Sequence, residues 1–168
     1  MLVIKLKMVE PEIKMLIPKL LVGKHLNMSI QNNRTAELWK SFMPQRNQIQ
    51  HKVTSDLISM QVYPDQFKFV PFNIAANFEK WAAVEVSQVD SLPDGFETFE
   101  LQGGTYAVFP YKGAVMNAAP FFRMIFEEWL PASGYELRQA PHFELLGEKY
   151  SNTSPDSEEE IWIPVTKK

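Results

Sequence analysis

The sequence predicts an α+β domain built as a tandem duplication of one strand–helix–strand–strand (βαββ) unit. The chain has 168 residues, 45% hydrophobic and 22% charged, which is typical of a single globular domain. Short segments of alternating polarity indicate strands, and two longer segments have the apolar spacing of amphipathic helices. Because one unit is too small to be stable alone, we expect the two copies to form one antiparallel sheet, with two helices on one face and a ligand groove between the repeats.

The two halves of the chain align at nearly constant separations, which is the main sign of the duplication. Tyr63 and Tyr150 are 87 residues apart (150 − 63), as are the prolines that follow the two predicted helices. Trp81 and Trp162 are 81 apart (162 − 81), so the loop before the last strand is shorter in the second copy. Two similar units that arose independently are the alternative. The expected boundaries are residues 1–8 for an N-terminal extension, 9–165 for the domain, and about 9–90 and 96–165 for the repeats.

The first half has the predicted order of strand, helix, strand and strand. Apolar residues over 12–22 predict a strand, and Pro18 within it indicates a bend or a sheet edge because proline cannot donate a ladder hydrogen bond. Apolar residues at helical spacing over 36–43 predict a helix, which Pro44 ends. Two further strands are predicted over 57–63 and 81–86.

The second half repeats this order. A turn at 91–95 and the pair Gly103-Gly104 precede a strand predicted over 105–109. Five large apolar residues at helical spacing predict a helix over 118–130, which Pro131 ends. Two further strands are predicted over 143–150 and 159–165.

The composition excludes several kinds of site. The chain contains no cysteine, which rules out disulfides, cysteine-ligated zinc and a thiolate nucleophile. Its three histidines lack metal-ligand spacing, and neither a phosphate-binding loop nor a dinucleotide fingerprint is present, so we expect no metal and no cofactor. The formal net charge of −3 argues against direct DNA binding. No apolar segment has the length of a membrane helix or the form of a signal peptide, so we expect a cytoplasmic protein that does not contact a membrane.

Aromatic residues on the predicted strands are candidates for the wall of a ligand groove. Trp81 and Trp162 have equivalent positions in the two copies, and Tyr106 and Tyr150 lie on strands of the second half. Together they would line a pocket for a flat or cationic molecule. Cross-strand packing within the sheet is the alternative explanation.

The last predicted strand follows an acidic run that supplies a candidate functional carboxylate. Since side chains alternate along a strand, Glu160 and Trp162 share one face, while Ile161 and Ile163 share the other. If the two isoleucines pack against the helices, Glu160 and Trp162 face the groove together. A carboxylate there would bind a cation, or act as a general acid or base if burial raises its pKa. A solvated charge run before a strand is the alternative.

Four motifs follow one another along the chain: Val-Gly at 22–23, a central segment at 81–113, FEEWLPASGYE at 126–136 and EEIWIPV at 159–165. Their order resembles the GyrI-like small-molecule-binding family, which includes the effector-binding domains of AraC- and MerR-type multidrug regulators. The resemblance implies a tandem-duplicated fold that binds bulky, often cationic organic molecules in a cleft between its repeats.

The resemblance also implies specific site residues. The family's glutamate directly precedes the IWIP-type strand, which places it at Glu160. The implied aromatic residues of the cleft are Trp81, Tyr106, Phe109 and Trp162.

Three functions are consistent with these observations. The first is binding or sensing of a bulky hydrophobic, cationic small molecule by a stand-alone domain, since the sequence contains no helix-turn-helix segment. The second is hydrolysis of small strained xenobiotics, which the resemblance to some stand-alone members implies; Glu160 would activate water, and Tyr106 or Tyr150 would donate a proton. The third is interaction with a protein partner, such as inhibition of a topoisomerase through the acidic surface.

Overall fold

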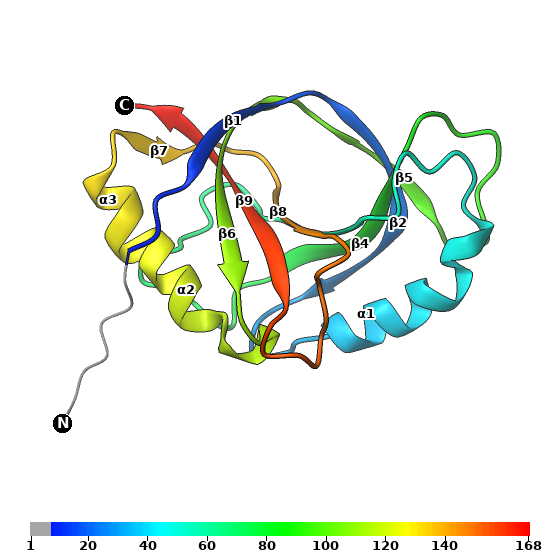
Figure 1. Cartoon of the computed structure of the whole chain (residues 1–168), viewed down its shortest axis with the longest axis horizontal. Coiled ribbons are helices and arrows are strands. Elements are labelled where there is room, and N and C mark those ends of the chain that lie inside the picture. The colour runs from blue at the N-terminus through cyan, green and yellow to red at the C-terminus, as the bar shows by residue number, and fades with distance from the viewer. Residues whose placement is uncertain (1–7) are drawn as a thin grey trace.

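The computed structural model describes residues 8–168, which form one large antiparallel sheet with helices packed on one of its faces (Figure 1). Residues 1–7 of the expected N-terminal extension lie outside the described residues. The elements of the first half are β1 (Glu12–Leu16), β2 (Lys19–Met28), α1 (Thr35–Phe42), η1 (Met43–Gln48), β3 (Leu57–Val62) and β4 (Phe78–Val86). Those of the second half are β5 (Glu97–Leu101), β6 (Gly104–Lys112), η2 (Val115–Asn117), α2 (Ala119–Arg123), η3 (Met124–Trp129), α3 (Leu130–Ala132), β7 (Tyr135–Leu137), β8 (His142–Leu146) and β9 (Glu158–Lys167).

Both predicted helices are present, and both extend past the prolines that were expected to end them. Pro44 lies in the first turn of η1, a 3₁₀ helix that continues α1. Pro131 lies in the first turn of α3, the last part of a continuous helical segment formed by α2, η3 and α3. Each proline lies near the end of a continuous helical segment, where its missing N–H removes one backbone hydrogen bond. The helix changes its hydrogen-bond pattern at these places, to a 3₁₀ helix in η1 and to a π-helix in η3 directly before α3.

Each half has two strands before its helix, and the second half has the additional strand β7 after it, so the predicted βαββ unit is one strand short in the first half and two strands short in the second. The segment 12–22 is divided at Pro18 into β1 and β2, which do not pair with each other. The segment 97–101, for which no strand was expected, forms β5. The predicted strand over 143–150 ends at Leu146, since residues 148–149 form a turn.

The order of strands in the sheet is β1-β6-β9-β8-β3-β4-β2-β5, with β7 added beside β9. The two halves exchange their first strands, because β1 pairs with β6 and β5 pairs with β2. They also meet at the centre of the sheet, where β3 pairs with β8. The middle of the sheet therefore carries side chains from both halves.

The core has three parts that leave the centre of the helix face uncovered. One cluster packs under α2 and η3 around Phe109, and a second packs under α1 around Phe42. A third fills the opposite, concave face of the sheet around Trp81 and Tyr106. In Figure 1 the two helices lie at opposite ends of the same side of the sheet. Polar side chains of β3, β4 and β8 occupy the space between them. None of the helices in residues 8–168 is long and apolar enough to cross a membrane.

Candidate functional site

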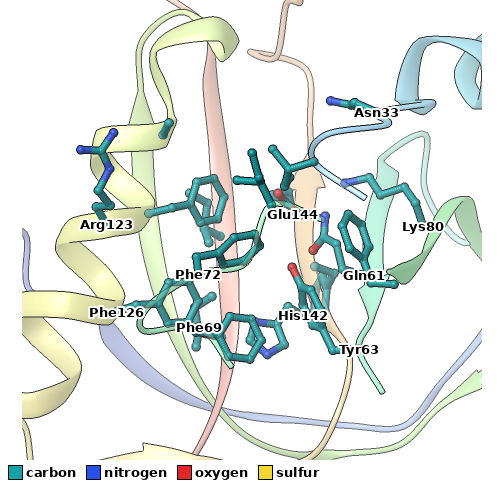
Figure 2. A pocket seen from close by; sticks show the side chains of 18 of the residues that line it. Asn33, Gln61, Tyr63, Phe69, Phe72, Lys80, Arg123, Phe126, His142 and Glu144 are labelled. Carbon is teal, nitrogen blue, oxygen red and sulfur yellow. Dashed lines mark hydrogen bonds between the residues drawn. The ribbon is translucent and has the colours of Figure 1, made fainter. Parts of the chain in front are cut away.

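A cavity of about 660 Å³ lies between the two helical segments on the helix face of the sheet (Figure 2). One wall comes from α2 and η3, and the opposite wall from the segment that leads into α1. The loop between β3 and β4 covers part of the cavity with Phe69, Phe72 and Ile74. The floor is formed by β3, β4, β8 and β9, so both halves of the chain contribute to it.

Aromatic rings form one side of the cavity. Phe69, from the loop, stacks on Phe126 of η3 and on His142 of β8, with ring centroids 4.9 Å apart in each pair. The rings of Phe126 and His142 are themselves 6.1 Å apart, so the three rings form one cluster. The ring of Tyr63 approaches Phe69 edge-on at 4.7 Å and His142 at 4.9 Å. These contacts hold the loop against both the helix and the sheet, and they present a flat apolar wall suited to an aromatic ligand.

The floor of the cavity carries three polar side chains from neighbouring strands. Gln61 of β3 lies directly opposite Lys80 of β4 in the ladder, and Glu144 of β8 projects from the same face. The side-chain amide of Gln61 donates a hydrogen bond of 3.0 Å to Glu144 Oε2. The alternation of side chains along each strand places these groups on the helix face, where no helix covers them.

Burial perturbs the titratable groups of the cavity floor and also Glu159, which borders a separate hollow at the start of β9. Desolvation lowers the pKa of Lys80, against the opposing effect of Glu144 and Glu159. Desolvation raises the pKa of Glu159 to about 7, and the negative charge of Glu144 adds to this shift. His142 is buried against aromatic rings, and its desolvation lowers its pKa to about 3, so its ring is neutral. Burial and the nearby Glu144 also raise the pKa of Tyr63.

The raised pKa of Glu159 predicts that this carboxyl group destabilises the fold at alkaline pH. Because its pKa is higher in the fold than in the unfolded chain, its stabilising contribution is complete below about pH 4.5 and is lost as the pH rises through about 7. After allowing for its partial exposure to solvent, we expect Glu159→Gln to raise the free energy of unfolding at pH 8 by about 1–2 kcal/mol, with little change at pH 4.5. Urea unfolding at the two pH values measures this.

The matched control is Glu160→Gln, because Glu160 is the next residue on β9, is also half-buried and points to the opposite face. An equal gain in stability from both substitutions at pH 8 would show that the effect comes from net charge and not from the environment of Glu159.

Three of the predicted site residues lie on the concave face, opposite the helices. Trp81 packs under the ring of His25 at 4.5 Å, and its indole N–H donates to Glu79. Tyr106 is buried, and its hydroxyl donates a hydrogen bond of 2.8 Å to the carbonyl oxygen of Pro141. Trp162 stacks on Phe143 with ring centroids 5.1 Å apart.

Trp162 also borders the cavity, whereas Trp81 and Tyr106 do not. Met60 and Phe143 lie between Trp81 and Trp162 in one cross-strand row. The two tryptophans therefore contribute to packing on the concave face, as the alternative explanation proposed.

The remaining predicted residues are divided between the core and a second hollow. Phe109 is fully buried beneath η3, with its ring edge-on to Trp129 at 5.1 Å. Glu160 borders a more open hollow of about 1310 Å³ at the start of β9. Tyr150 is half-buried in the loop after β8, and its pKa is raised by burial, with further contributions from Glu159 and Glu144.

Glu160 and Tyr106 are not brought together. Glu160 lies opposite Pro110 of β6, four positions along that strand from Tyr106. The expected orientation of Ile161 and Ile163 toward the helices is observed, since both pack in the cluster beneath η3. The cavity, however, lies on the face of the sheet that carries these isoleucines, whereas the groove was expected on the face that carries Glu160.

The sequence-based prediction missed Lys80, Glu144 and the aromatic loop. A usable signal was present in the segment 67–72, where three phenylalanines occur in a stretch assigned to a loop. Connecting loops are usually polar, so clustered aromatic residues in one indicate that it packs against a cavity or another element. Within residues 8–168 no group of three or more His, Cys, Asp or Glu side chains has the arrangement of a metal site.

Comparison with known proteins identifies relatives of the whole domain. The family model described as a GyrI-like small molecule binding domain matches residues 9–166. The transcriptional regulator BrlR of Pseudomonas aeruginosa is 25% identical over 148 residues, which cover 86% of this chain and 51% of BrlR. The chain thus spans about half the length of this curated relative.

Solved structures share the fold. SAV2435 bound to tetraphenylphosphonium superposes with a TM-score of 0.65 and 20% identity, over 94% of both chains. The C-terminal domain of EcmrR has a TM-score of 0.67 and 14% identity, over 96% of this chain and all (100%) of that domain. A hydrolase from Listeria innocua has a TM-score of 0.58 and 8% identity, over 94% of this chain and 92% of the hydrolase.

Proposed function

The chain belongs to the GyrI-like small-molecule-binding domain family, and from this premise we propose that it binds a bulky, hydrophobic cation in the cavity between its helices. The observation that carries the proposal is the juxtaposition of an aromatic wall with the carboxylate of Glu144. The position of the cavity, where the two halves of the chain meet, supports this proposal.

Each part of the cavity matches one property of such a ligand. The stacked rings of Phe69 and Phe126 offer apolar area and the negative faces of aromatic rings, both of which attract an organic cation. Gln61 engages Oε2 of Glu144, and Oε1 accepts no hydrogen bond from residues 8–168. That oxygen is available as countercharge in a partly desolvated site, where an ion pair is stronger than in water.

Tetraphenylphosphonium, the molecule bound to SAV2435, is a suitable first probe because it is bulky, aromatic and cationic. In isothermal titration calorimetry we expect saturable binding at one site. We expect Glu144→Gln to weaken binding about 10-fold, because the amide keeps the shape of the side chain and its contact with Gln61 but removes the charge.

The control for overall charge is Glu128→Gln. Glu128 lies on η3 and is exposed outside the cavity, so its substitution changes the net charge equally. An equal loss of affinity in both variants would refute a local role for Glu144, and the absence of binding to the wild-type protein would refute the proposed site.

Hydrolysis is the second candidate, and the state of Glu159 favours it. A carboxyl group with a pKa of about 7 suits general acid–base chemistry at neutral pH, and Tyr150 is close enough to be affected by its charge. Glu159 would take the role first assigned to Glu160, and Tyr150, one of the two tyrosines first considered, would donate the proton. Hydrolysis of a strained small electrophile that is abolished by Glu159→Gln, with tetraphenylphosphonium binding intact, would establish this activity in addition to binding.

A further inference from the structure

Lys80 is a buried cation at the floor of the cavity. Its residue is only 8% exposed, yet it lines the cavity, and Figure 2 shows its side chain extending from β4 toward the interior. Among residues 8–168, no carboxylate lies within 4.0 Å of its ammonium nitrogen, and no group accepts a hydrogen bond from it. The ammonium nitrogen keeps contact with the cavity, since it is not among the buried polar atoms that lack a partner. It is therefore a donor that an anionic group of a ligand can reach in a partly desolvated site.

The neighbouring acids do not satisfy Lys80. Desolvation lowers the pKa of Lys80, and the charges of Glu144 and Glu159 oppose this shift, but neither carboxylate forms an ion pair with it. One oxygen of Glu144 is already held by Gln61 on the intervening strand β3. The floor therefore carries a positive and a negative group that form no ion pair with each other. Both groups border the cavity.

This separation selects for a particular class of ligand. A simple cation would be attracted by Glu144 and repelled by Lys80. A simple anion would be attracted by Lys80 and repelled by Glu144. A molecule that carries both charges would satisfy both groups. The aromatic wall adds the requirement for ring systems.

We propose that the cavity binds an amphoteric aromatic ligand, whose cationic group lies near Glu144 and whose carboxylate or equivalent anionic acceptor binds Lys80. The inference rests on the proposed function of the same cavity and makes it more specific. Lys80 is then the residue that determines ligand choice, because it distinguishes a zwitterion from a plain organic cation of the same shape.

Three probes with one scaffold test this. They are tetraphenylphosphonium, (4-carboxyphenyl)triphenylphosphonium, which is a zwitterion at neutral pH, and the methyl ester of the latter, which is a cation of nearly the same size. For the wild-type protein we expect the zwitterion to bind at least about 10-fold more tightly than its ester. Lys80→Met should remove this preference and leave the affinity for tetraphenylphosphonium unchanged or increased. Calorimetric titration at pH 7 gives all the affinities.

Two further variants separate the local role of Lys80 from other effects. Lys80→Gln retains a donor without the charge and is the second choice if Lys80→Met does not fold. Lys40→Met removes the same charge from an exposed position on α1 and should leave the preference for the zwitterion intact.

The outcomes distinguish this inference from the proposed function. Binding of tetraphenylphosphonium without a preference for the zwitterion, or with a preference that survives both substitutions of Lys80, overturns the inference alone. If none of the three probes binds, the proposed function fails and the inference fails with it.

Discussion

Replacement of Phe109 by alanine is expected to lower the free energy of unfolding by about 3–5 kcal/mol. The side chain is fully buried beneath η3, and its ring is in edge-on contact with Trp129 at 5.1 Å and Phe121 at 6.3 Å. Truncation would lose the buried apolar area, leave a cavity and remove both aromatic contacts. Guanidinium unfolding followed by tryptophan fluorescence measures the change.

The matched comparison is Phe72→Ala in the loop over the cavity. Phe72 is 38% exposed and lines the cavity, so we expect a loss of stability below about 1 kcal/mol but weaker binding of tetraphenylphosphonium. The resemblance to the family assigned Phe109 to the ligand cleft. A Phe109→Ala variant that keeps its stability and loses binding would support that assignment and contradict the structural role described above.

Acidification is expected to destabilise the protein through His142. The pKa of this histidine is about 3 in the fold, compared with about 6.5 in an unfolded chain, so the unfolded chain takes up the proton first. The contribution of the neutral ring to stability is therefore complete above about pH 6.5 and is lost progressively as the pH falls toward 3. Between pH 7 and pH 5 the loss from this group amounts to about 2 kcal/mol.

Urea unfolding of the wild-type protein and of His142→Phe at pH 7, 6 and 5 isolates this effect. Phenylalanine keeps the ring that stacks on Phe69 but cannot take up a proton. We expect the variant to lose about 2 kcal/mol less than the wild type over this range. His51→Gln is the control, because His51 lies at the surface. An unchanged pH slope in His142→Phe would show that the acid sensitivity has another origin.

The positions of the helices could be predicted well because they depend on local patterns. The first helix was predicted over 36–43 and is observed as Thr35–Phe42, followed directly by η1. The second was predicted over 118–130 and is observed from Ala119 to Ala132. The spacing of large apolar residues decides which face of a helix is buried, and this spacing is visible in the sequence.

The pairing of the strands could not be predicted in this way. Strands β1 and β5 are short edge strands, and each pairs with a strand of the other half of the chain. Their partners are set by the three-dimensional path of the chain and not by any pattern within the strands themselves. The sequence-based prediction consequently omitted β5 and merged β1 with the start of β2 into one strand.

Most of the predicted site residues and the cavity lie on opposite faces of the sheet for a related reason. Alternation along β9 correctly separated Glu160 and Trp162 from Ile161 and Ile163, and the isoleucines face the helices as expected. The alternation of side chains along a strand does not determine which face of the sheet retains an open cavity. That depends on how far apart the two helices lie and on where the loop with Phe69 packs.

The sequence by itself determined the α+β class, the two helices and the membership of a small-molecule-binding domain family. These follow from local periodicity and from motifs that are contiguous in the chain. Only the tertiary structure decided which residues form the cavity. Lys80 and Glu144 are 64 positions apart (144 − 80) and border the same cavity because only β3 lies between β4 and β8 at the centre of the sheet. Their charges face the same space because the helices cover the sheet on either side of them and leave its centre open.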